Sequence, residues 1–453
     1  ETELAHINIR KGHNIRISGS PENEYFSRPK SKTVSIQPNN FRYVKPKLLV
    51  KVGDKVDIGS PIFFDKVQPD IKWASPGGGE IKEIILGDRR SVENIIIELN
   101  EEEKSVLHTP VKYQEISSLG KAKVTDQIME ANLWPMIRQR PFNKIADPND
   151  TPMAIFVSGF NSAPLTVNLD FALRYKQSVF QAGLNVLNQL SNGNVHLTFE
   201  VDTNCETLTA ARNVNLHTVN GPHPSGNVGI QIHHINPWKP NEVIWVINAQ
   251  HVLTIGDLFL KGIYDPSIVA TVAGPGVKNP AHIQTRTGAS IETFLLDNLN
   301  SDDNRIISGD ILTGQETNLN GFLGYYDTTI SVVPNSNERE FLGLLKPGNE
   351  QSRYSVTNAF ISQNKSNFNF TTQQSGSLRP MVPINAWENM LPMDIYPNAL
   401  YRSILAEDFE EMEGLGLLEC DEEDFALCSF VCPSKIDVGS VIRHGLNLMK
   451  DDG

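Results

Sequence analysis

Long apolar runs, cysteine and positive charge are all scarce in this 453-residue sequence. It has no run of about 18 apolar residues, the length that a membrane-spanning helix needs, and its start has no apolar signal region. The four cysteines are too few for a secreted disulfide scaffold, so we expect a reducing, cytosolic location. The net charge of −13 argues against a general nucleic-acid binder.

Two phosphate-binding motifs are also missing. The dinucleotide fingerprint G-x-G-x-x-G and the P-loop G-x-x-x-x-G-K-[ST] place glycines where the backbone must approach a phosphate. Neither occurs in the chain. The apolar stretch AIFVSGF (154–160) is followed by Asn161-Ser162-Ala163-Pro164, which offers no such cradle. The sequence therefore gives no support for direct nucleotide binding.

What is present is typical of a soluble multidomain protein, with 39% hydrophobic and 21% charged residues. Residues 1–104 contain short β-prone segments separated by turn residues. Residues 105–261 carry apolar runs at 154–160, 194–201 and 241–248, which are typical of buried parallel strands. Amphipathic helices are predicted at 115–139 and 169–190, and the alternation predicts an α/β domain.

Two further regions follow. Residues 262–345 return to short β-prone segments, and residues 346–453 comprise a linker and a C-terminal helical domain, with apolar residues at helical spacing over 397–431. The polar stretch 363–377 is predicted to be a loop.

The segment 50–84 resembles biotinyl and lipoyl carrier domains. The shared features are V-G-D-x-V-x-x-G-x-P, then Asp65-Lys66, then Ser75-Pro76 with Gly77 to Gly79. The resemblance implies a barrel-sandwich fold and leaves two readings of Lys66, a modified swinging-arm lysine or an ordinary surface lysine. We favour the second, because Lys66 lies further from Ser75-Pro76 than in carriers and because aromatic residues nearby indicate packing: Phe63, Phe64 and Trp73.

The segment 131–148, ANLWPMIRQRPFNKIADP, is similar in position to the glycine-rich loop of flavin-bearing NADH dehydrogenase subunits and of Rnf C subunits. That loop lets backbone amides approach the flavin phosphate. Here bulky residues from Pro135 to Arg140 occupy the region and should block the approach. The resemblance implies a Rossmann-like α/β domain, and these residues predict that it binds neither flavin nor nicotinamide.

The segment 270–296 resembles the soluble-ligand-binding β-grasp module. The matching features are V-x-G-x-G-V-x-N-P and T-G-A-S-I, and Gly274 and Gly276 are interpreted as turn glycines. We favour a structural adaptor over a ligand-binding module here.

Three of the four cysteines lie in CDEEDFALCSFVCPSK (420–435). Cubane iron–sulfur sites often read C-x2-C-x2-C-x3-C-P. In that frame the four ligand positions are Glu422, Phe425, Cys428 and Cys432. Two ligands are therefore missing, and Cys420 is out of frame. We predict buried thiols and no metal; a three-cysteine site completed by Asp421 or Glu422 is the less favoured alternative.

Several long motifs are similar to the A-subunit family of the sodium-translocating NADH:quinone oxidoreductases. The resemblance runs from Arg10 to Gly453, and the stretches that carry it are 221–229, 236–252, 305–314, 379–397 and 421–433.

This resemblance implies a translocase of the bacterial inner membrane, with six subunits. Such a complex passes electrons from NADH through flavins and iron–sulfur centres to ubiquinone or menaquinone while Na⁺ crosses the membrane. The A-type subunit is expected to be peripheral on the cytoplasmic face, to hold no cofactor and no catalytic residue, and to serve assembly and quinone binding. The alternatives are a structural adaptor without quinone contact, a flavin-dependent NADH dehydrogenase-like electron-input protein, and a carrier protein.

A quinone ring needs an aromatic or aliphatic slot and donors for its carbonyl oxygens. The stretches NNFRYVK (39–45) and RQRPFNK (138–144) combine these properties. The predicted quinone-binding residues are Phe41, Arg42, Tyr43, Arg138, Arg140, Phe142 and Lys144. The alternative is that the arginines pair with acidic groups of this chain or of a neighbouring subunit.

The histidines at His223, His233, His234 and His251 are interpreted as structural. His233 and His234 are predicted to be adjacent in a strand, where they would point to opposite faces and could not share a metal.

Overall fold

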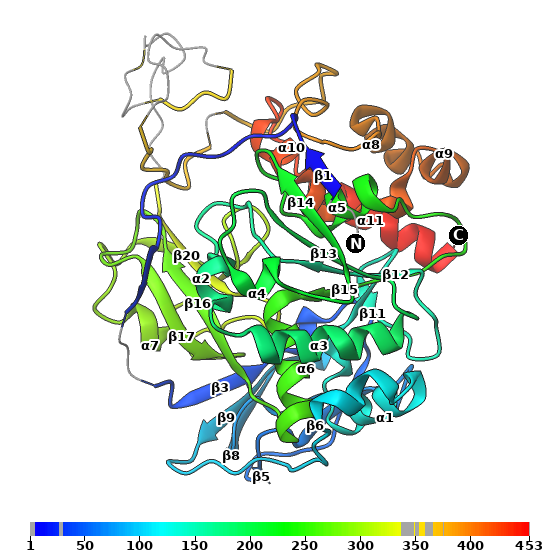
Figure 1. Ribbon diagram of the computed structural model, residues 1–453. Helices are drawn as coiled ribbons and strands as arrows, with labels where there is room; N and C mark the ends of the chain where they lie inside the picture. The colour runs from blue at the N-terminus through cyan, green and yellow to red at the C-terminus, as the bar shows by residue number, and fades with distance from the viewer. Residues whose placement is uncertain are drawn as a thin grey trace.

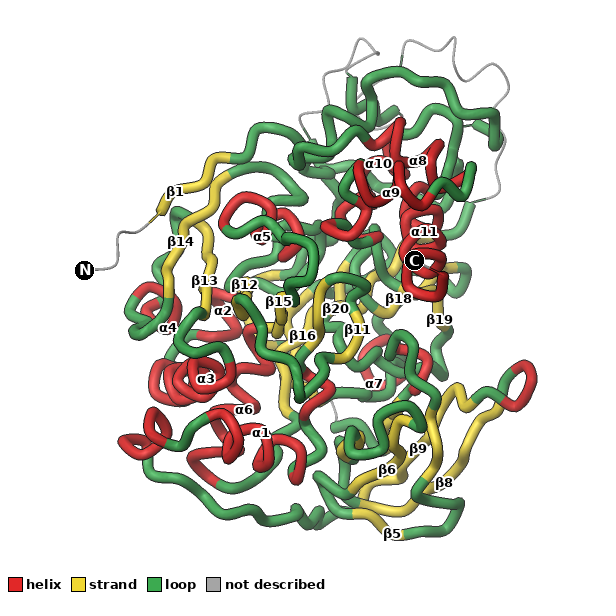
Figure 2. The backbone as a smooth tube through the Cα atoms, turned by 90° about the vertical axis from the view of Figure 1, so that its right-hand side faces the viewer, coloured by secondary structure: helices red, strands yellow, loops and turns green. Residues whose placement is uncertain are grey.

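The computed structural model describes residues 5–26, 30–336, 348, 353–357, 366–374 and 376–452. A seven-stranded sheet lies at the centre of the molecule, with a small group of strands below it and the C-terminal helices above it (Figure 1). The same arrangement seen from the side places the C-terminal helix α11 along one edge (Figure 2).

The central sheet has the strand order β1-β14-β13-β12-β15-β10-β11. Neighbouring strands from β1 to β15 run parallel, and β10 and β11 are antiparallel additions. The strands predicted from the three apolar runs are confirmed. The bounds are β1 (Ala5–Asn8), β10 (Arg138–Arg140), β11 (Lys144–Ile145), β12 (Ala154–Ser158), β13 (Val195–Glu200), β14 (Asn215–Asn220) and β15 (Ile244–Asn248).

Helices cover both faces of this sheet. Side chains alternate along β12 and β15, so each strand packs against helices on either face. Ile155 and Trp245 belong to the core that includes α3 (Gln177–Leu190) and α6 (Ala249–Lys261), whereas Phe156 and Val246 pack with α5 (Val228–Ile235). The remaining helices of this region are α1 (Lys121–Glu130), α2 (Leu169–Leu173) and α4 (Glu206–Thr209).

Three local predictions in this region were wrong. The helix predicted over 115–139 is confined to α1, because Asn132 takes a left-handed φ of 59° and Pro135 follows. The helix predicted over 169–190 is two helices, separated by Tyr175 at φ 62°. His233 and His234 lie in α5 instead of a strand.

The N-terminal strands form two small sheets, of order β3-β9-β8-β5 and β4-β6-β7. Phe63 and Trp73 stack between neighbouring strands with ring centroids 4.5 Å apart and are fully buried, which confirms the packed segment predicted there. The bounds are β3 (Thr33–Ile36), β4 (Pro46–Leu48), β5 (Lys55–Val56), β6 (Pro61–Asp65), β7 (Lys72–Ala74), β8 (Gly79–Leu86) and β9 (Val92–Leu99).

The third sheet has the order β19-β18-β20-β16-β17-β2. The first two strands of the chain thus leave the N-terminal sheets: β1 joins the central sheet and β2 joins this one. Gly274 has φ 115°, which fits its interpretation as a turn glycine. The bounds are β2 (Glu22–Tyr25), β16 (Ser267–Ala273), β17 (Ala281–Arg286), α7 (Glu292–Leu295), β18 (Asn304–Ser308), β19 (Gln315–Thr317) and β20 (Thr329–Pro334).

The C-terminal region is helical, as its apolar spacing predicted. Its helices are α8 (Pro397–Leu405), α9 (Phe409–Gly414), α10 (Ala426–Val431) and α11 (Val438–Asp452). Within the predicted loop 363–377, the described residues form only an isolated bridge between Phe368 and Ile17; residues 363–365 and 375 lie outside the described part.

Candidate functional site

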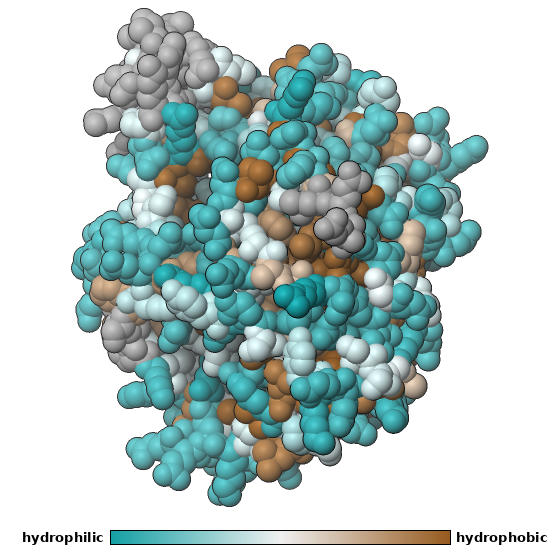
Figure 3. All heavy atoms as spheres, viewed as in Figure 1, coloured by the Kyte–Doolittle hydropathy of each residue, from teal (hydrophilic) through white to brown (hydrophobic). Residues whose placement is uncertain are grey.

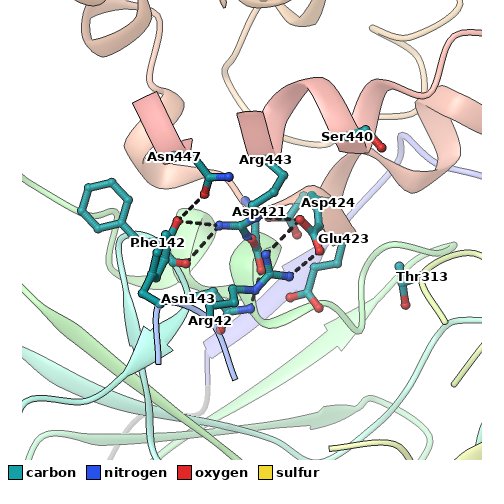
Figure 4. Close-up of polar contacts among 12 residues, drawn as sticks. Arg42, Phe142, Asn143, Thr313, Asp421, Glu423, Asp424, Ser440, Arg443 and Asn447 are labelled. Atoms are coloured by element: carbon teal, nitrogen blue, oxygen red, sulfur yellow. Dashed lines mark hydrogen bonds and ion pairs between the residues drawn. The ribbon is translucent and has the colours of Figure 1, made fainter. Parts of the chain in front are cut away.

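A cluster of charged side chains joins the C-terminal helices to the rest of the molecule (Figure 4). Asp421 is 1% exposed and lies between two arginines. It forms ion pairs with Arg140, at 3.3 Å, and with Arg443 of α11. Asn143 donates to the same oxygen as Arg140, with Nδ2 2.6 Å from Asp421 Oδ2, while Arg443 contacts Oδ1. A buried carboxylate therefore ties the central sheet to the last helix.

The neighbouring acids extend the cluster to the N-terminal sheets. Glu422 pairs with Arg42, and its Oε2 also lies 2.6 Å from Arg443 Nε. Glu423 lies 2.9 Å from Arg140 Nη2. We call this set the arginine–acid junction: Arg42, Arg140, Arg443, Asp421, Glu422, Glu423 and Asp424.

The junction sets opposite pKa shifts on two of its acids. Burial alone would raise the pKa of Asp421, but the charges of Arg140, Arg42 and Arg443 outweigh it and lower that pKa to about 2. Burial, reinforced by the charges of Glu423 and Asp421, raises the pKa of Asp424 to about 7. Asp421 is thus the anion that the arginines hold, whereas the raised pKa of Asp424 disfavours its ionised form.

The structure brings most of the predicted quinone-binding residues to this junction. Arg42 and Arg140 are engaged with its acids, as the alternative prediction had it. Tyr43 Oη donates to Asn447 Oδ1 at 2.7 Å, and Arg443 Nη1 lies 3.1 Å from the carbonyl oxygen of Phe142. The ring of Phe142 points away from the polar network (Figure 4) and is half-buried.

The other predicted residues lie apart from these contacts. Phe41 is buried among aromatic rings, 5.0 Å from Trp73 and 4.9 Å from Tyr325, so it serves the core. Arg138 stacks over Tyr326, at 4.6 Å, and lines a cavity. Lys144 is half-buried at the start of β11.

That cavity has a volume of about 250 Å³ and lies where β12 and β15 end. Its wall includes Ser158 and Asn248, the last residues of these strands, and Asp327 from the loop before β20. Sequence reasoning did not single it out, although the polar residues after each apolar run were a usable signal.

The cysteine stretch is packed as core. Cys420, Cys428 and Cys432 are free thiols, each at most 2% exposed, and Phe425 is fully buried with them in one apolar cluster. Burial raises the pKa of Cys428 above its usual range, which disfavours the thiolate that a metal needs. No set of three or more metal-ligating side chains suited to an ion is found among the described residues. These residues do not fit an iron–sulfur cluster.

The segment 131–148 is also packed as core. Trp134 is fully buried, its Nε1 donates to Ala146 O at 2.7 Å, and it meets Trp245 edge-on at 5.5 Å. Pro135 and Met136 are buried with it. A flavin phosphate would have to displace this core, so the residues present do not fit that cofactor.

Lys66 is exposed in the turn that follows β6. Its position suits an ordinary surface lysine and equally a modified one, so the two readings stay open.

The two buried histidines, His223 and His251, have lowered pKa values. Burial lowers the pKa of His251 to about 3, with a smaller contribution from Arg138, and lowers the pKa of His223 to about 4. His233 Nδ1 lies 3.1 Å from Glu419 Oε2, and His234 Nε2 contacts Pro392 O at 2.9 Å. The two neighbours thus contact different groups.

We predict that His251→Phe makes the protein less sensitive to acid. The unfolded chain binds the proton below its ordinary pKa of 6.5, whereas the folded chain binds it only near 3. Stability is therefore lost as pH falls from 6.5 toward 3, by about 2 kcal/mol at pH 5. Urea unfolding at pH 7 and pH 5 should show a difference smaller by about that amount in the variant. The exposed His444→Gln serves as control, and an unchanged difference in His251→Phe would refute the assignment.

No helix within the described residues is long and apolar enough to cross a membrane. The face seen in Figure 3 is mainly hydrophilic, with apolar side chains in small groups.

Comparison with known proteins matches nearly the whole chain. The family descriptions "NqrA N-terminal barrel-sandwich hybrid domain", "NqrA second alpha/beta domain" and "NQRA C-terminal domain" match residues 7–100, 119–264 and 268–318. The A subunit of the "Na(+)-translocating NADH-quinone reductase" of Saccharophagus degradans is 35% identical over 450 residues, covering 99% of this chain and 100% of that protein. The protein of the same name from Histophilus somni is 34% identical over 449 residues, with the same coverage.

Two solved structures also match. Both are titled as NAD⁺-reducing [NiFe]-hydrogenase, in the air-oxidized and H₂-reduced states, with TM-scores of 0.35 and 0.38 and 11% and 12% identity. They cover 51% and 50% of this chain, and 52% and 49% of theirs. At these TM-scores and identities, the two structures support no conclusion about this chain.

Proposed function

Because the chain belongs to the A-subunit family of the Na(+)-translocating NADH-quinone reductases, we propose that it serves assembly and the quinone end of that complex without a redox cofactor of its own. The full-length match to the A subunits carries this proposal. The chain would be one of six subunits, peripheral on the cytoplasmic face of the bacterial inner membrane. Its central and third sheets would be Rossmann-like and β-grasp folds.

Two features support a cofactor-free role. Bulky buried side chains fill the segment where related flavoproteins carry a glycine-rich loop, and an apolar ring stands at one of the four cluster positions. A flavin-dependent electron-input role would require a different, glycine-rich segment and a cysteine in place of the apolar ring. The flavins and iron–sulfur centres would then belong to other subunits of the complex.

The quinone contact is proposed at the surface beside the arginine–acid junction. Arg443 Nη1 lies 3.4 Å from Tyr43 Oη and 3.1 Å from the carbonyl of Phe142, so the two predicted stretches meet on one helix. Lys450 lies over the Tyr43 ring at 4.4 Å. The half-buried ring of Phe142 offers an apolar face, and the ammonium group of Lys450 offers a donor for a carbonyl oxygen. A membrane-embedded partner protein would complete the slot.

We predict that Phe142→Ala raises the KM for quinone of the assembled complex, by about tenfold if the ring contributes a stacking contact of roughly 1 kcal/mol and its apolar burial. The KM for NADH should not change, because electron input lies in other subunits. Tyr113→Ala, an aromatic residue 40% exposed elsewhere on the surface, is the control. An unaltered quinone KM in Phe142→Ala and in Tyr43→Leu would favour the structural adaptor.

A further inference from the structure

The cavity at the ends of β12 and β15 occupies the topological switch point of the central sheet. The chain passes from β12 to β13 and β14 on one side and returns to β15 on the other side of β12. Connections that leave in opposite directions open a crevice at the carboxyl ends of the two strands, where open α/β sheets bind ligands. The cavity of about 250 Å³ lies at this place.

Arg138 and the start of a helix line the cavity, and no carboxylate among the described residues forms an ion pair with Arg138. Helix α6 begins directly after β15, and its first N–H groups have no acceptor within the helix. Asn248 stands at its N-cap but makes no capping bond; its Oδ1 lies 3.4 Å from Arg138 Nη2 instead. Arg138 makes no ion pair with a carboxylate among the described residues. A guanidinium and a helix N-terminus thus face the same cavity.

The acids in the wall are engaged elsewhere. Asp310 accepts from the backbone N–H groups of Leu312 and Thr313, at 2.7 and 3.1 Å. Glu423 pairs with Arg140 in the junction. Asp327 accepts from Ser308 Oγ at 2.6 Å, and burial raises its pKa. None of them forms an ion pair with Arg138, although its charge acts to lower the pKa values of Glu423 and Asp327.

A buried donor without a partner lies in the same wall. Ser162 Oγ accepts from Gly226 N at 2.7 Å and lies 2.9 Å from His223 Nδ1. When the hydroxyl donates its proton to Nδ1, the proton of the neutral His223 ring lies on Nε2. The residue is 2% exposed, and Nε2 has no hydrogen-bond partner among the described residues. An unpaired buried donor costs roughly 1–3 kcal/mol, a cost that an acceptor oxygen in the cavity would remove.

We propose that this cavity binds the anionic group, phosphate or carboxylate, of a small polar ligand. Arg138 and the N-terminus of α6 hold the negative charge, and His223 donates to one of its oxygens. The site neighbours the junction through Glu423 but does not depend on the quinone proposal, because a quinone is a neutral ligand placed at Phe142. The small volume restricts the occupant to a short ligand or to the anionic head of a longer one.

The test is calorimetric titration of the full chain with inorganic phosphate and with acetate, against chloride at equal ionic strength. Saturable binding of either probe at one site supports the proposal, and the probe that binds tells phosphate from carboxylate chemistry. Arg138→Met should weaken binding by about tenfold or more, as expected for the loss of a charge-assisted hydrogen bond. Arg305→Gln, which removes a surface arginine paired with Glu316, should bind as the parent protein does.

Asn248→Asp keeps the proposal testable if Arg138→Met folds poorly. A carboxylate at the N-cap would cap α6 and pair with Arg138, so the variant should unfold at a higher temperature and lose the probe. Binding of neither probe above the chloride background would overturn the proposal. Equal affinity in the parent protein, Arg138→Met and Asn248→Asp would overturn it as well and would indicate an adventitious ion only.

Discussion

Asp421→Asn is expected to reduce the free energy of unfolding by about 3–5 kcal/mol, the usual cost of removing one partner from a buried ion pair. The side chain is 1% exposed, and the substitution leaves Arg140, itself 5% exposed, and Arg443 without their shared anion. The C-terminal helices should then separate from the central sheet before the rest unfolds. In the complex, the same variant should assemble poorly.

Urea unfolding followed by far-UV circular dichroism measures this effect. The exposed pair of Lys82 and Glu98, with side chains 51% and 58% exposed, provides the control: Glu98→Gln should cost less than about 1 kcal/mol. The folded pKa of Asp421, near 2, also predicts how the stabilisation depends on pH. Because this value lies below that of the unfolded chain, the stabilisation is complete above about pH 4 and is lost as pH falls toward 2. A cost for Asp421→Asn no larger than that of the control would contradict the role of the junction.

Trp134→Gly is expected to cost a similar amount, about 3–5 kcal/mol for the lost indole with roughly 1 kcal/mol more for the glycine. Trp134 is fully buried against Trp245 and donates to Ala146. If the segment were a closed cofactor loop, removing the indole would open a flavin site. Because it is core, the variant should be less stable and remain colourless when titrated with flavin mononucleotide.

Denaturant unfolding and flavin fluorescence quenching check the two parts of this prediction. Leu107→Gly, at a loop residue 78% exposed, should change stability by less than about 0.5 kcal/mol. Saturable flavin binding by Trp134→Gly would show that the segment had kept the shape of a cofactor site.

The sequence predicted those elements whose signal is local. The apolar runs at 154–160, 194–201 and 241–248 became β12, β13 and β15, because a buried parallel strand needs apolar side chains on both faces. The break at Tyr175 escaped prediction, since a left-handed φ of 62° at a residue other than glycine leaves no mark in composition. The residues of β1 and β2 are mostly exposed, so they show no apolar pattern from which their pairing with the distant strands β14 and β17 could be predicted.

The sequence indicated the acids of the junction but not their partners. Four consecutive acids at 421–424 lie between apolar residues of a helical stretch, and buried carboxylates need cations. The sequence could not say which arginines would pair with them, because Arg42 and Arg140 lie in two regions distant in sequence that packing brings to the acids. The arginines chosen for a quinone proved to be partners of these acids, while Arg138 alone remained without one among the described residues.

The most direct test of the account is to assay the complex assembled without this chain, supplying NADH and either quinone or ferricyanide, an acceptor that takes electrons from the input side. The account predicts that NADH oxidation by ferricyanide continues, whereas quinone reduction is lost and returns when the chain is added back. Loss of both activities, restored together by the chain, would contradict it and place electron input in this chain.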